Sequence, residues 1–336
     1  MAVYTQIDNP ELYFQIKLWT GNDGSNALTF DGSENMQPDF VWLKPRSRTD
    51  NHRLMDSVRT AGKMLPSNSN GAEESLSEFV SFDTDGFTLN TSDAGYNSSS
   101  HTYVAWCWKK TATAGFDIVA YTGNATNRTI SHSLSAVPKM IFIKNRDSSG
   151  GSGEHWLVYH ASLGNTHGLF LNQTVPFDDD ATYFQDTTPT SSVFSIGTSD
   201  RCNKNTEGNI AYLFSEVQGF SKITKVAGNN NNNGPYVWCG FSPSFLLFKE
   251  FTSGTNDSWY IIDNKRNTGN PRNRNLRPNN TDDEQAASWL NIDFLSNGYK
   301  INDDDAAINE SGREYVVLAF AEAPFVNSKG VPNNAR

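Results

Sequence analysis

Short apolar runs separated by polar turns cover most of this chain, and they return in a fixed order. The clearest run is a proline, one further residue, four apolar residues and a lysine. It occupies residues 38–44, 138–144 and 243–249, so the copies begin 100 and 105 residues apart. Each run is too short for a helix and is rich in aromatic or branched side chains. This pattern predicts one buried strand in each of three repeats.

Four further blocks accompany this run in the same order, which predicts an internal threefold repeat. A Gly-Asn turn precedes the run, and a second strand, a turn with an alternating strand and an apolar closing strand follow it. The copies are 18–22, 120–124 and 225–229; 53–56, 156–159 and 259–263; 85–89, 192–196 and 297–301; and 103–108, 209–214 and 315–320. The closing strand from Val104 to Trp108 is apolar throughout, so we expect it to be covered on both faces. Gly86 and Gly298 are expected to supply the positive φ of hairpin turns.

A repeat of about 100 residues can bury a core of its own, whereas solenoid repeats have about 20 to 50 residues. The sequence therefore predicts an all-β fold with three tandem β-sandwich or jelly-roll-like domains. The predicted division is an N-terminal docking arm at 1–14, domains at 15–110, 116–218 and 223–325, and a C-terminal tail at 326–336. The polar segments 109–115 and 218–224 are expected to be linkers.

The two terminal segments lie outside the repeats, and we expect them to become ordered only by docking on another molecule. Apolar residues among polar neighbours in the first segment predict an arm that adds a strand to a neighbouring subunit. The candidate docking residues are Ile7, Leu12, Tyr13 and Phe14.

Charge and composition narrow the classes of partner. The formal net charge is −10 and no basic stripe is present, which argues against nucleic acid. No apolar run approaches the roughly 20 residues that span a bilayer, so membrane insertion is not expected. Residues 1–7 are polar and predict synthesis in the cytoplasm without a secretory signal. Three cysteines without paired spacing predict free thiols.

Candidate chemistry is sparse. Acidic clusters at 178–180, 282–284 and 303–305 lie in polar sequence, where solvated carboxylates keep ordinary pKa values; a calcium site is the alternative. His155 and His160 are five residues apart around a predicted strand, so they should point to opposite faces. We therefore predict no catalytic, metal-binding or cofactor-binding residues, and a protein that is not an enzyme.

The aromatic residues fall into two groups. Trp42, Trp106, Trp108, Trp238 and Phe248 lie inside predicted strands, where core packing is the expected role. A second group lies nearer polar loop sequence, where exposed rings could stack on sugars or fill an interface. These candidate exposed contacts are Trp19, Tyr96, Tyr183 and Trp289.

Several of these blocks resemble a repeat domain in virion proteins of marine tailed phages that infect cyanobacteria and other abundant ocean bacteria. The segments that carry the resemblance are 38–44 (PDFVWLK), 82–89 (FDTDGFTL), 102–108 (TYVAWCW), 294–299 (FLSNGY) and 319–325 (AFAEAPF). The resemblance covers residues 12–325, and proteins of this group are usually described as structural or tail-fibre-like. It implies a place on the surface of the phage particle and supplies no catalytic residues.

The resemblance implies a structural protein that works by non-covalent binding. One expected role is a tail-fibre or tail-associated protein that contacts the host, which the Asn, Ser and aromatic content suits because such residues contact glycans. The alternative is a knob or cement protein on the capsid, since three copies in one chain could imitate a trimer. A polysaccharide-degrading tailspike enzyme is the least favoured alternative. The expected partners are other virion proteins, further copies of this chain and a host surface glycan.

Overall fold

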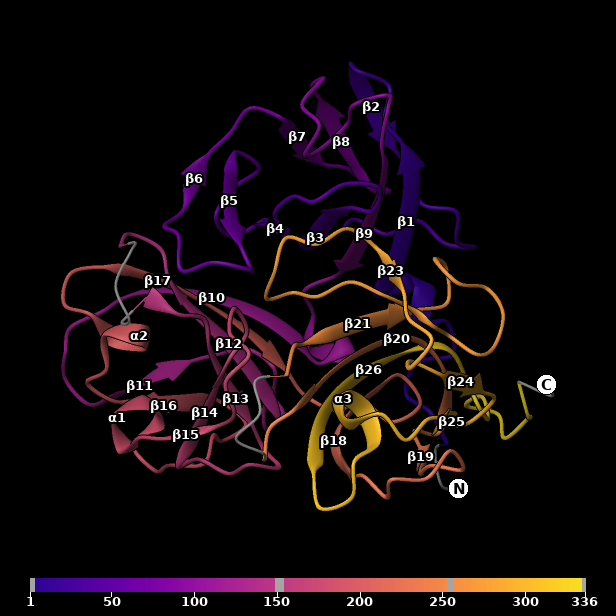
Figure 1. The fold of residues 1–336 in the computed structure, drawn as a ribbon. Coiled ribbons are helices and arrows are strands. Elements are labelled where there is room, and N and C mark those ends of the chain that lie inside the picture. The colour runs from indigo at the N-terminus through magenta and orange to yellow at the C-terminus, as the bar shows by residue number, and fades with distance from the viewer. Residues whose placement is uncertain (1–3, 149–153, 253–256, 334–336) are drawn as a thin grey trace.

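The computed structural model describes residues 4–148, 154–252 and 257–333, and its strands form three units (Figure 1). We call β1–β9 unit 1, β10–β17 unit 2 and β18–β26 unit 3. In Figure 1 they are three lobes, with unit 1 at the top, unit 2 at the lower left and unit 3 at the lower right. Residues 1–3 of the predicted arm and 334–336 of the predicted tail lie outside the described residues.

Unit 1 has a main sheet in the order β1-β9-β3-β4-β5-β6 and a small sheet in the order β2-β8-β7. A 3-10 turn, η1, precedes this unit and a second, η2, follows it. The elements are η1 (Pro10–Leu12), β1 (Phe14–Thr20), β2 (Ser25–Leu28), β3 (Phe40–Pro45), β4 (Arg53–Asp56), β5 (Lys63–Pro66), β6 (Glu74–Ser75), β7 (Phe79–Phe82), β8 (Phe87–Asn90), β9 (Thr102–Trp108) and η2 (Ala112–Ala114).

Unit 2 repeats this strand order, with a main sheet β10-β17-β12-β13-β14-β15 and a two-stranded sheet β11-β16. Of its two single-turn helices, α1 lies beside β16 and α2 lies beside β12. The elements are β10 (Phe116–Thr122), β11 (Arg128–Ser131), β12 (Met140–Asn145), β13 (Leu157–His160), β14 (His167–Phe170), β15 (Asp178–Asp179), α1 (Ala181–Phe184), β16 (Val193–Ile196), α2 (Asp200–Asn203) and β17 (Gly208–Phe214).

Unit 3 has the main sheet β18-β26-β20-β21, the small sheet β19-β25-β24 and a short pair β22-β23. The elements are β18 (Ser221–Ala227), β19 (Tyr236–Trp238), β20 (Phe241–Glu250), β21 (Tyr260–Asp263), β22 (Arg274–Asn275), β23 (Gln285–Ala286), β24 (Ile292–Leu295), β25 (Gly298–Ile301), α3 (Ala306–Asn309) and β26 (Glu314–Pro324). All paired strands are antiparallel, and the prediction of an all-β, sandwich-like fold is confirmed.

The closing strand of each unit is buried on both faces, as the sequence predicted for the first unit, because it lies in the middle of a main sheet. In β9, Tyr103, Ala105 and Cys107 face the small sheet and form a core within unit 1. The alternate residues Val104, Trp106 and Trp108 belong to a second core that is shared by all three units. Unit 2 divides its side chains in the same way.

The shared core differs from the sequence expectation, which gave each repeat an interior of its own. Aromatic rings from different units meet in it: Phe40 of unit 1 stacks on Tyr212 of unit 2 at 4.5 Å. Phe14 of unit 1 stacks on Phe320 of unit 3 at 5.1 Å, and Trp108 lies 5.6 Å from the same ring. In unit 3 the two faces of the main sheet belong to one continuous cluster. The three units therefore exclude water jointly at the centre of the molecule.

The repeated Gly-Asn turns have a steric explanation. Gly21, Gly123 and Gly228 each pack against the backbone of a short turn that precedes the closing strand. A Cβ would meet Ser98 O at 2.2 Å, Lys204 O at 2.0 Å and Glu310 O at 2.2 Å, respectively. Each turn carries a fully buried asparagine, and these are Asn97, Asn203 and Asn309. Close approach is therefore the reason that glycine stands at the end of the first strand in every unit.

Two expectations about backbone geometry have different outcomes. Gly86 has a φ of +93°, as predicted for its hairpin turn. Gly298 does not adopt a positive φ; it is the first residue of β25, and a Cβ there would lie 2.1 Å from Val237 O. The second predicted linker is also partly strand, since β18 begins at Ser221.

The described terminal segments fold back onto their own chain, which corrects the expectation that they need another molecule for order. Thr5 Oγ1 donates a hydrogen bond to Gln218 O at 3.1 Å, at the connection between units 2 and 3. Ser328 donates from its backbone N–H to Asp8 Oδ1 at 2.7 Å. The two segments therefore contact each other beside unit 3, near where Figure 1 marks both chain ends.

Candidate functional site

Three buried lysines form hydrogen bonds between the units. They are the lysines of the repeated Pro-initiated run, and each is fully buried at the end of the strand. Each donates a hydrogen bond to a backbone carbonyl of a neighbouring unit: Lys44 to Thr281 (3.3 Å), Lys144 to Asn70 (3.4 Å) and Lys249 to Thr174 (2.9 Å). Unit 1 thus contacts unit 3, unit 2 contacts unit 1, and unit 3 contacts unit 2. The units form a closed ring.

The residue just before β13 in unit 2 and just before β21 in unit 3 is a tryptophan that also forms a hydrogen bond to a neighbouring unit. Trp156 of unit 2 donates its indole N–H to Pro66 O of unit 1 at 2.9 Å, and Trp259 of unit 3 donates to Phe170 O of unit 2 at 2.9 Å. His52 occupies this position in unit 1 and accepts a hydrogen bond from the indole of Trp42. Burial lowers the pKa of His52 well below its usual value, so the ring is neutral. The two tryptophans give the contacts of unit 2 with unit 1 and of unit 3 with unit 2 a buried directional bond, whereas the bond of His52 lies within unit 1.

We name the contacts between units joint 1–2, joint 2–3 and joint 3–1. At joint 1–2, Arg146 pairs with Glu73 at 2.7 Å; at joint 3–1, Arg46 pairs with Glu284 at 2.9 Å. Burial acts to raise the pKa of each glutamate, but the hydrogen bonds and charge of the arginines outweigh it and lower the pKa. The backbone N–H of each glutamate also donates to the carbonyl of its arginine, and at joint 2–3 Phe177 N donates in the same way to Phe251 O at 3.3 Å. The rings of Phe177 and Phe251 lie 6.4 Å apart.

Glu284 belongs to an acidic cluster that was expected to be solvated loop charge, and this expectation is wrong for it. Its side chain is largely buried between Arg46, Arg266 and Arg274. The arginines lie far from it in sequence or in another unit, so the local polar sequence gives no sign of the burial.

Two of the joints also contain ion pairs near the ends of their strands. Joint 1–2 contains Lys110 paired with Asp117 at 3.3 Å. Joint 2–3 contains Glu216, which pairs with Lys139 and, at 3.0 Å, with Lys222. The strand registers make Lys110, Glu216 and Glu322 equivalent in the three units. The same registers make Gln15, Asp117 and Lys222 equivalent.

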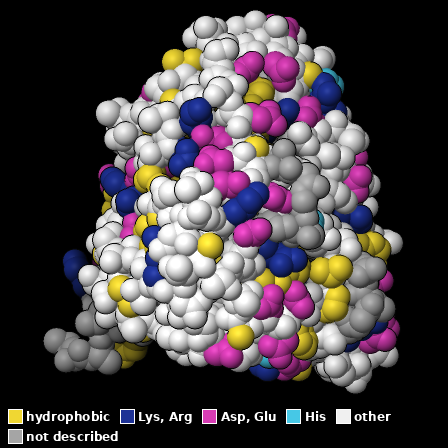
Figure 2. Space-filling model, turned by 90° about the vertical axis from the view of Figure 1, so that its left-hand side faces the viewer, with side chains coloured by type: hydrophobic (Ala, Val, Ile, Leu, Met, Phe, Trp, Pro, Cys, Tyr) yellow, Lys and Arg dark blue, Asp and Glu magenta, His cyan; other side chains and the backbone are white. Residues whose placement is uncertain are grey.

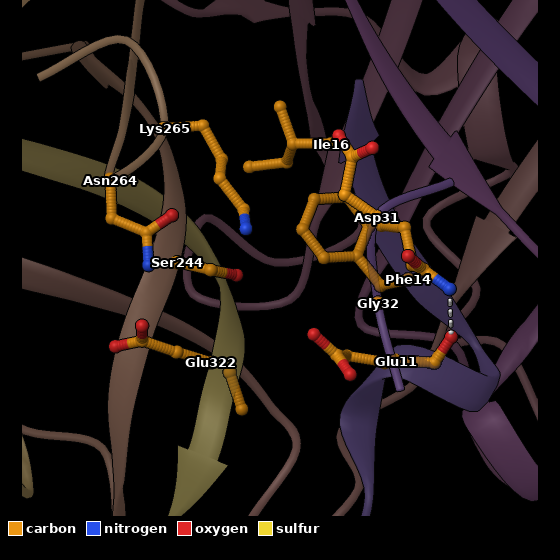
Figure 3. Close-up of a pocket in the computed structure, with 11 residues that line it drawn as sticks. Glu11, Phe14, Ile16, Asp31, Gly32, Ser244, Asn264, Lys265 and Glu322 are labelled. Atoms are coloured by element: carbon orange, nitrogen blue, oxygen red, sulfur yellow. Dashed lines mark hydrogen bonds between the residues drawn. The ribbon is translucent and has the colours of Figure 1, made fainter. Parts of the chain in front are cut away.

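Joint 3–1 contains a pocket where the other two joints have ion pairs (Figure 3). Its volume is about 60 Å³, which corresponds to about four water molecules. Unit 1 lines one side with Glu11, Phe14, Gln15, Ile16, Asp31 and Gly32, and unit 3 lines the other with Ser244, Asn264, Lys265, Ala321 and Glu322. This joint lacks a direct chain connection, because unit 3 follows unit 1 only through unit 2.

The polar groups of the pocket are only partly satisfied. Asn264 is 8% exposed, and its Oδ1 atom is buried and accepts no hydrogen bond from the described residues. Figure 3 shows its side chain reaching from the unit 3 side toward the gap opposite Phe14. Glu11 accepts from the backbone of Ser33 at 2.7 Å, and Asp31 pairs with Lys17 at 2.7 Å. A ligand with hydrogen-bond donors would satisfy the free amide oxygen.

The structure buries three of the four predicted exposed aromatic contacts. Trp19 stacks on Tyr103 in the core of unit 1, Tyr96 lies under Arg53, and Tyr183 is fully buried in unit 2. Trp289 is half-buried and contacts Tyr260 at 5.4 Å. The prediction of exposure failed because Trp19 lies in β1 and Tyr183 in α1, where their rings pack into the cores, and because Tyr96 packs against Arg53.

The candidate docking residues also lie within the ring. Ile7 and Phe14 are each 3% exposed and belong to the shared core, and Tyr13 contacts Phe220 of the connection to unit 3. Leu12 lies in η1. Phe14 begins β1 and pairs with Trp108 of its own unit, so the described part of the predicted arm does not project toward another subunit.

An exposed aromatic patch was missed by the sequence prediction. Trp238, predicted to be a core residue, is 57% exposed, and Tyr236 on the same strand is 44% exposed. The strand β19 lies at the edge of the small sheet of unit 3, so both side chains on its outer face meet solvent. Tyr4 and Trp238 line a nearby pocket of about 80 Å³. The flanking Asn-rich sequence at 229–233 was the available signal for an exposed edge.

The remaining features concern charge and metal ligands. On the face drawn in Figure 2, acidic and basic side chains are interspersed. Within the described residues, no group of three His, Cys, Asp or Glu side chains is arranged to hold a metal ion. Asp180 and Asp305 of the acidic clusters cap α1 and α3. No helix in the described part of the chain is long and apolar enough to cross a membrane.

A family model matches residues 9–324, which is almost all of the chain. The chain belongs to the family described as domain of unknown function DUF7483. A comparison with curated proteins finds no match. The matched range extends from the residue before η1 to the end of β26, so the family domain corresponds to the entire three-unit ring and not to one repeat.

Proposed function

We propose that this member of the DUF7483 family is a structural protein of a phage particle that acts by non-covalent binding. The observation that carries the proposal is the closed ring of three similar sandwich units around a shared aromatic core. Buried hydrogen bonds link every neighbouring pair of units, so the ring is a rigid support for its surface loops. The resemblance of the repeated blocks to marine phage virion proteins supports the location.

The position that the geometry favours is a threefold site on the capsid surface. One chain with three similar units presents three similar faces around a common centre, as a trimer of smaller subunits does. Such a ring can contact three equivalent surface proteins at once, and each added contact strengthens binding through effective concentration. The other virion proteins and further copies of the chain are the proposed partners.

A tail-associated role in host contact is the second candidate. The exposed rings of Trp238 and Tyr236 favour it, because exposed aromatic rings stack on sugars and a host surface glycan is the proposed ligand. The enzyme alternative has no comparable observation in its favour.

Imaging of phage particles from infected cells tests the proposal. Antibody fragments raised against the chain should label the particle surface, and label over the head supports capsid decoration. Label at the tail supports the host-contact role instead. Particles purified to homogeneity without any of this protein would overturn the proposal.

A further inference from the structure

The residues of the pocket at joint 3–1 can be compared with the residues at the equivalent positions of the other two joints. In joint 1–2 the ammonium of Lys110 lies 3.3 Å from Asp117, and in joint 2–3 Glu216 contacts two lysines. Each of these joints therefore contains a cation against a carboxylate at equivalent positions. Burial acts to raise the pKa of Glu216, but its bonds to both lysines lower it, so the carboxylate is charged there.

Joint 3–1 retains the carboxylate and lacks the paired cation. Glu322 stands at the position of Glu216, but Gln15 and Ser244 replace the two lysines. Within the described residues, Glu322 forms no ion pair and accepts only a 3.4 Å hydrogen bond from Ser242. Asn264 adds a buried acceptor, where the other units have Ser57 and Ala161. Unit 3 therefore lines this position with two acceptors, the Glu322 carboxylate and Asn264 Oδ1.

Lys265 is the only cationic side chain among the residues that line the pocket. It is exposed and forms no ion pair with Glu11, Asp31 or Glu322 in the described structure. Figure 3 shows its side chain extending toward the pocket from the unit 3 side. An exposed lysine can leave the pocket at little cost, because its ammonium is hydrated elsewhere equally well.

We propose that the pocket at joint 3–1 binds a lysine or arginine side chain from a partner protein. Asp31 is already paired with Lys17, so Glu11 and Glu322 against Lys265 give the pocket a net negative charge, and Asn264 Oδ1 accepts one donor of the incoming group. Phe14, Ile16 and Ala321 provide an apolar wall for the methylene stem. The volume of about 60 Å³ admits one such head group and excludes a folded ligand.

A side chain fits this pocket better than a metal ion. The carboxylates come from opposite walls, and the described residues contain no convergent group of metal ligands. The chain's net charge of −10 also favours a basic partner surface. The inference specifies how a partner is held and does not depend on whether that partner belongs to a phage particle.

The test uses the full-length protein and small cationic probes. N-acetyl-L-arginine methylamide and N-acetyl-L-lysine methylamide are titrated while backbone and side-chain amide signals are followed by NMR. We expect saturable shifts at the side-chain amide of Asn264 and the backbone amides of Gly32 and Ala321, with millimolar affinity. Shifts that are absent from these residues, or are matched by the neutral probe N-acetyl-L-norleucine methylamide, would overturn the inference.

Two substitutions give opposite expected results. Glu322→Gln removes the unpaired carboxylate and should weaken probe binding about tenfold, the size of one charge-assisted hydrogen bond. Lys265→Ala removes the competing cation and should strengthen binding severalfold. Asp304→Asn makes the same charge change on an exposed loop of unit 3 and is the control, which should leave the affinity unchanged.

Other outcomes contradict the inference directly. Equal weakening by Glu322→Gln and Asp304→Asn would mean general charge attraction and no specific pocket. Weaker binding in Lys265→Ala, or tighter binding of acetate than of the cations, would mean that the pocket prefers anions. Glu322 and Lys265 are both exposed, so the variants should keep the melting temperature of the parent protein. None of these results changes whether the protein labels phage particles.

Discussion

At the scale of single residues, the repeats are constrained by glycines and asparagines as much as by apolar side chains. Gly21, Gly123 and Gly228 let the end of the first strand touch the backbone of a short turn. In unit 2, Asn203 lies in this turn and accepts a hydrogen bond from Asn124 N at 2.9 Å. It also donates a hydrogen bond to Gly197 O at 2.6 Å. A polar residue that is fully buried in this way fixes a specific local geometry.

Gly123→Ala tests this constraint. The added methyl would meet Lys204 O at 2.0 Å, so the turn must shift and the buried bonds of Asn203 must stretch. We expect the free energy of unfolding to fall by about 2 kcal/mol in urea denaturation. Gly24→Ala is the matched control, because a Cβ there meets nothing within 4 Å, and it should change stability by less than about 0.5 kcal/mol. Equal effects of the two variants would contradict the steric explanation.

At the scale of elements, the strands are joined into one molecule by their ends. The lysine at the end of each Pro-initiated strand, the arginine two residues later in units 1 and 2, and the tryptophan before the next strand in units 2 and 3 all reach a neighbouring unit. The two arginine contacts are partly buried ion pairs. Removing one partner of such a pair leaves the other charge uncompensated, which costs more than the pair itself contributes.

Glu73→Gln tests the ion pair at joint 1–2. Glu73 accepts from Arg146 at 2.7 Å and from the fully buried Arg59 at 3.2 Å. Loss of its charge should lower the free energy of unfolding by about 3 kcal/mol. The exposed neighbour Glu74 makes no ion pair with any residue that the structure describes, and Glu74→Gln should be nearly neutral in the same denaturation experiment. A neutral result for Glu73→Gln would mean that the joint depends on apolar packing alone.

The first segment of the chain supports a different prediction from the one its sequence favoured. A truncated protein that begins at residue 9 loses Ile7 from the shared core and the bonds of Thr5 to Gln218. We expect the free energy of unfolding to fall by about 2 kcal/mol or more, since burial of one aliphatic side chain alone contributes about that amount. Unchanged stability together with lost incorporation into particles would instead restore the docking-arm hypothesis.

At the scale of the whole molecule, three lysine ammonium groups are withdrawn from water at the joints. Burial lowers the pKa of Lys44, Lys144 and Lys249 to about 8 in each case, against the opposing effect of nearby carboxylates. The folded protein therefore releases these protons at lower pH than the unfolded chain does. Between pH 8 and the unfolded pKa of 10.5, the unfolded state binds more protons, and raising the pH favours folding.

The buried thiols and tyrosines set the upper end of the pH range over which stability rises. Burial raises the pKa of Cys107, Cys202 and Cys239, so above about pH 9 the unfolded chain loses thiol protons that the folded chain keeps. Their contribution has the opposite sign. We therefore expect stability to rise between pH 8 and pH 9 by at least about 1 kcal/mol, and the rise to stop at higher pH.

Urea denaturation at pH 7, 8 and 9 measures this slope. Lys144→Met should reduce it by about one third, because it removes one of the three lysines. Lys329→Met removes an exposed lysine and should leave the slope unchanged. A stability that falls from pH 8 to pH 9 in the parent protein would contradict the assignment of the lysine pKa values.

The sequence alone predicted the all-β fold and located five segments of each unit that contain strands, because two-residue alternation, apolar runs and Gly-Asn turns are local patterns. It also predicted that the closing strand of unit 1 is covered on both faces, since Val104 to Trp108 contains no polar residue. Only the tertiary structure decided which residues of other units cover the closing strands. The ring, the burial of Glu284 and Phe14, and the exposure of Trp238 depend on partners that lie about 20 to 300 residues away. The pocket at joint 3–1 has the same origin, because Glu322 and Gln15 become neighbours only when the third unit closes against the first.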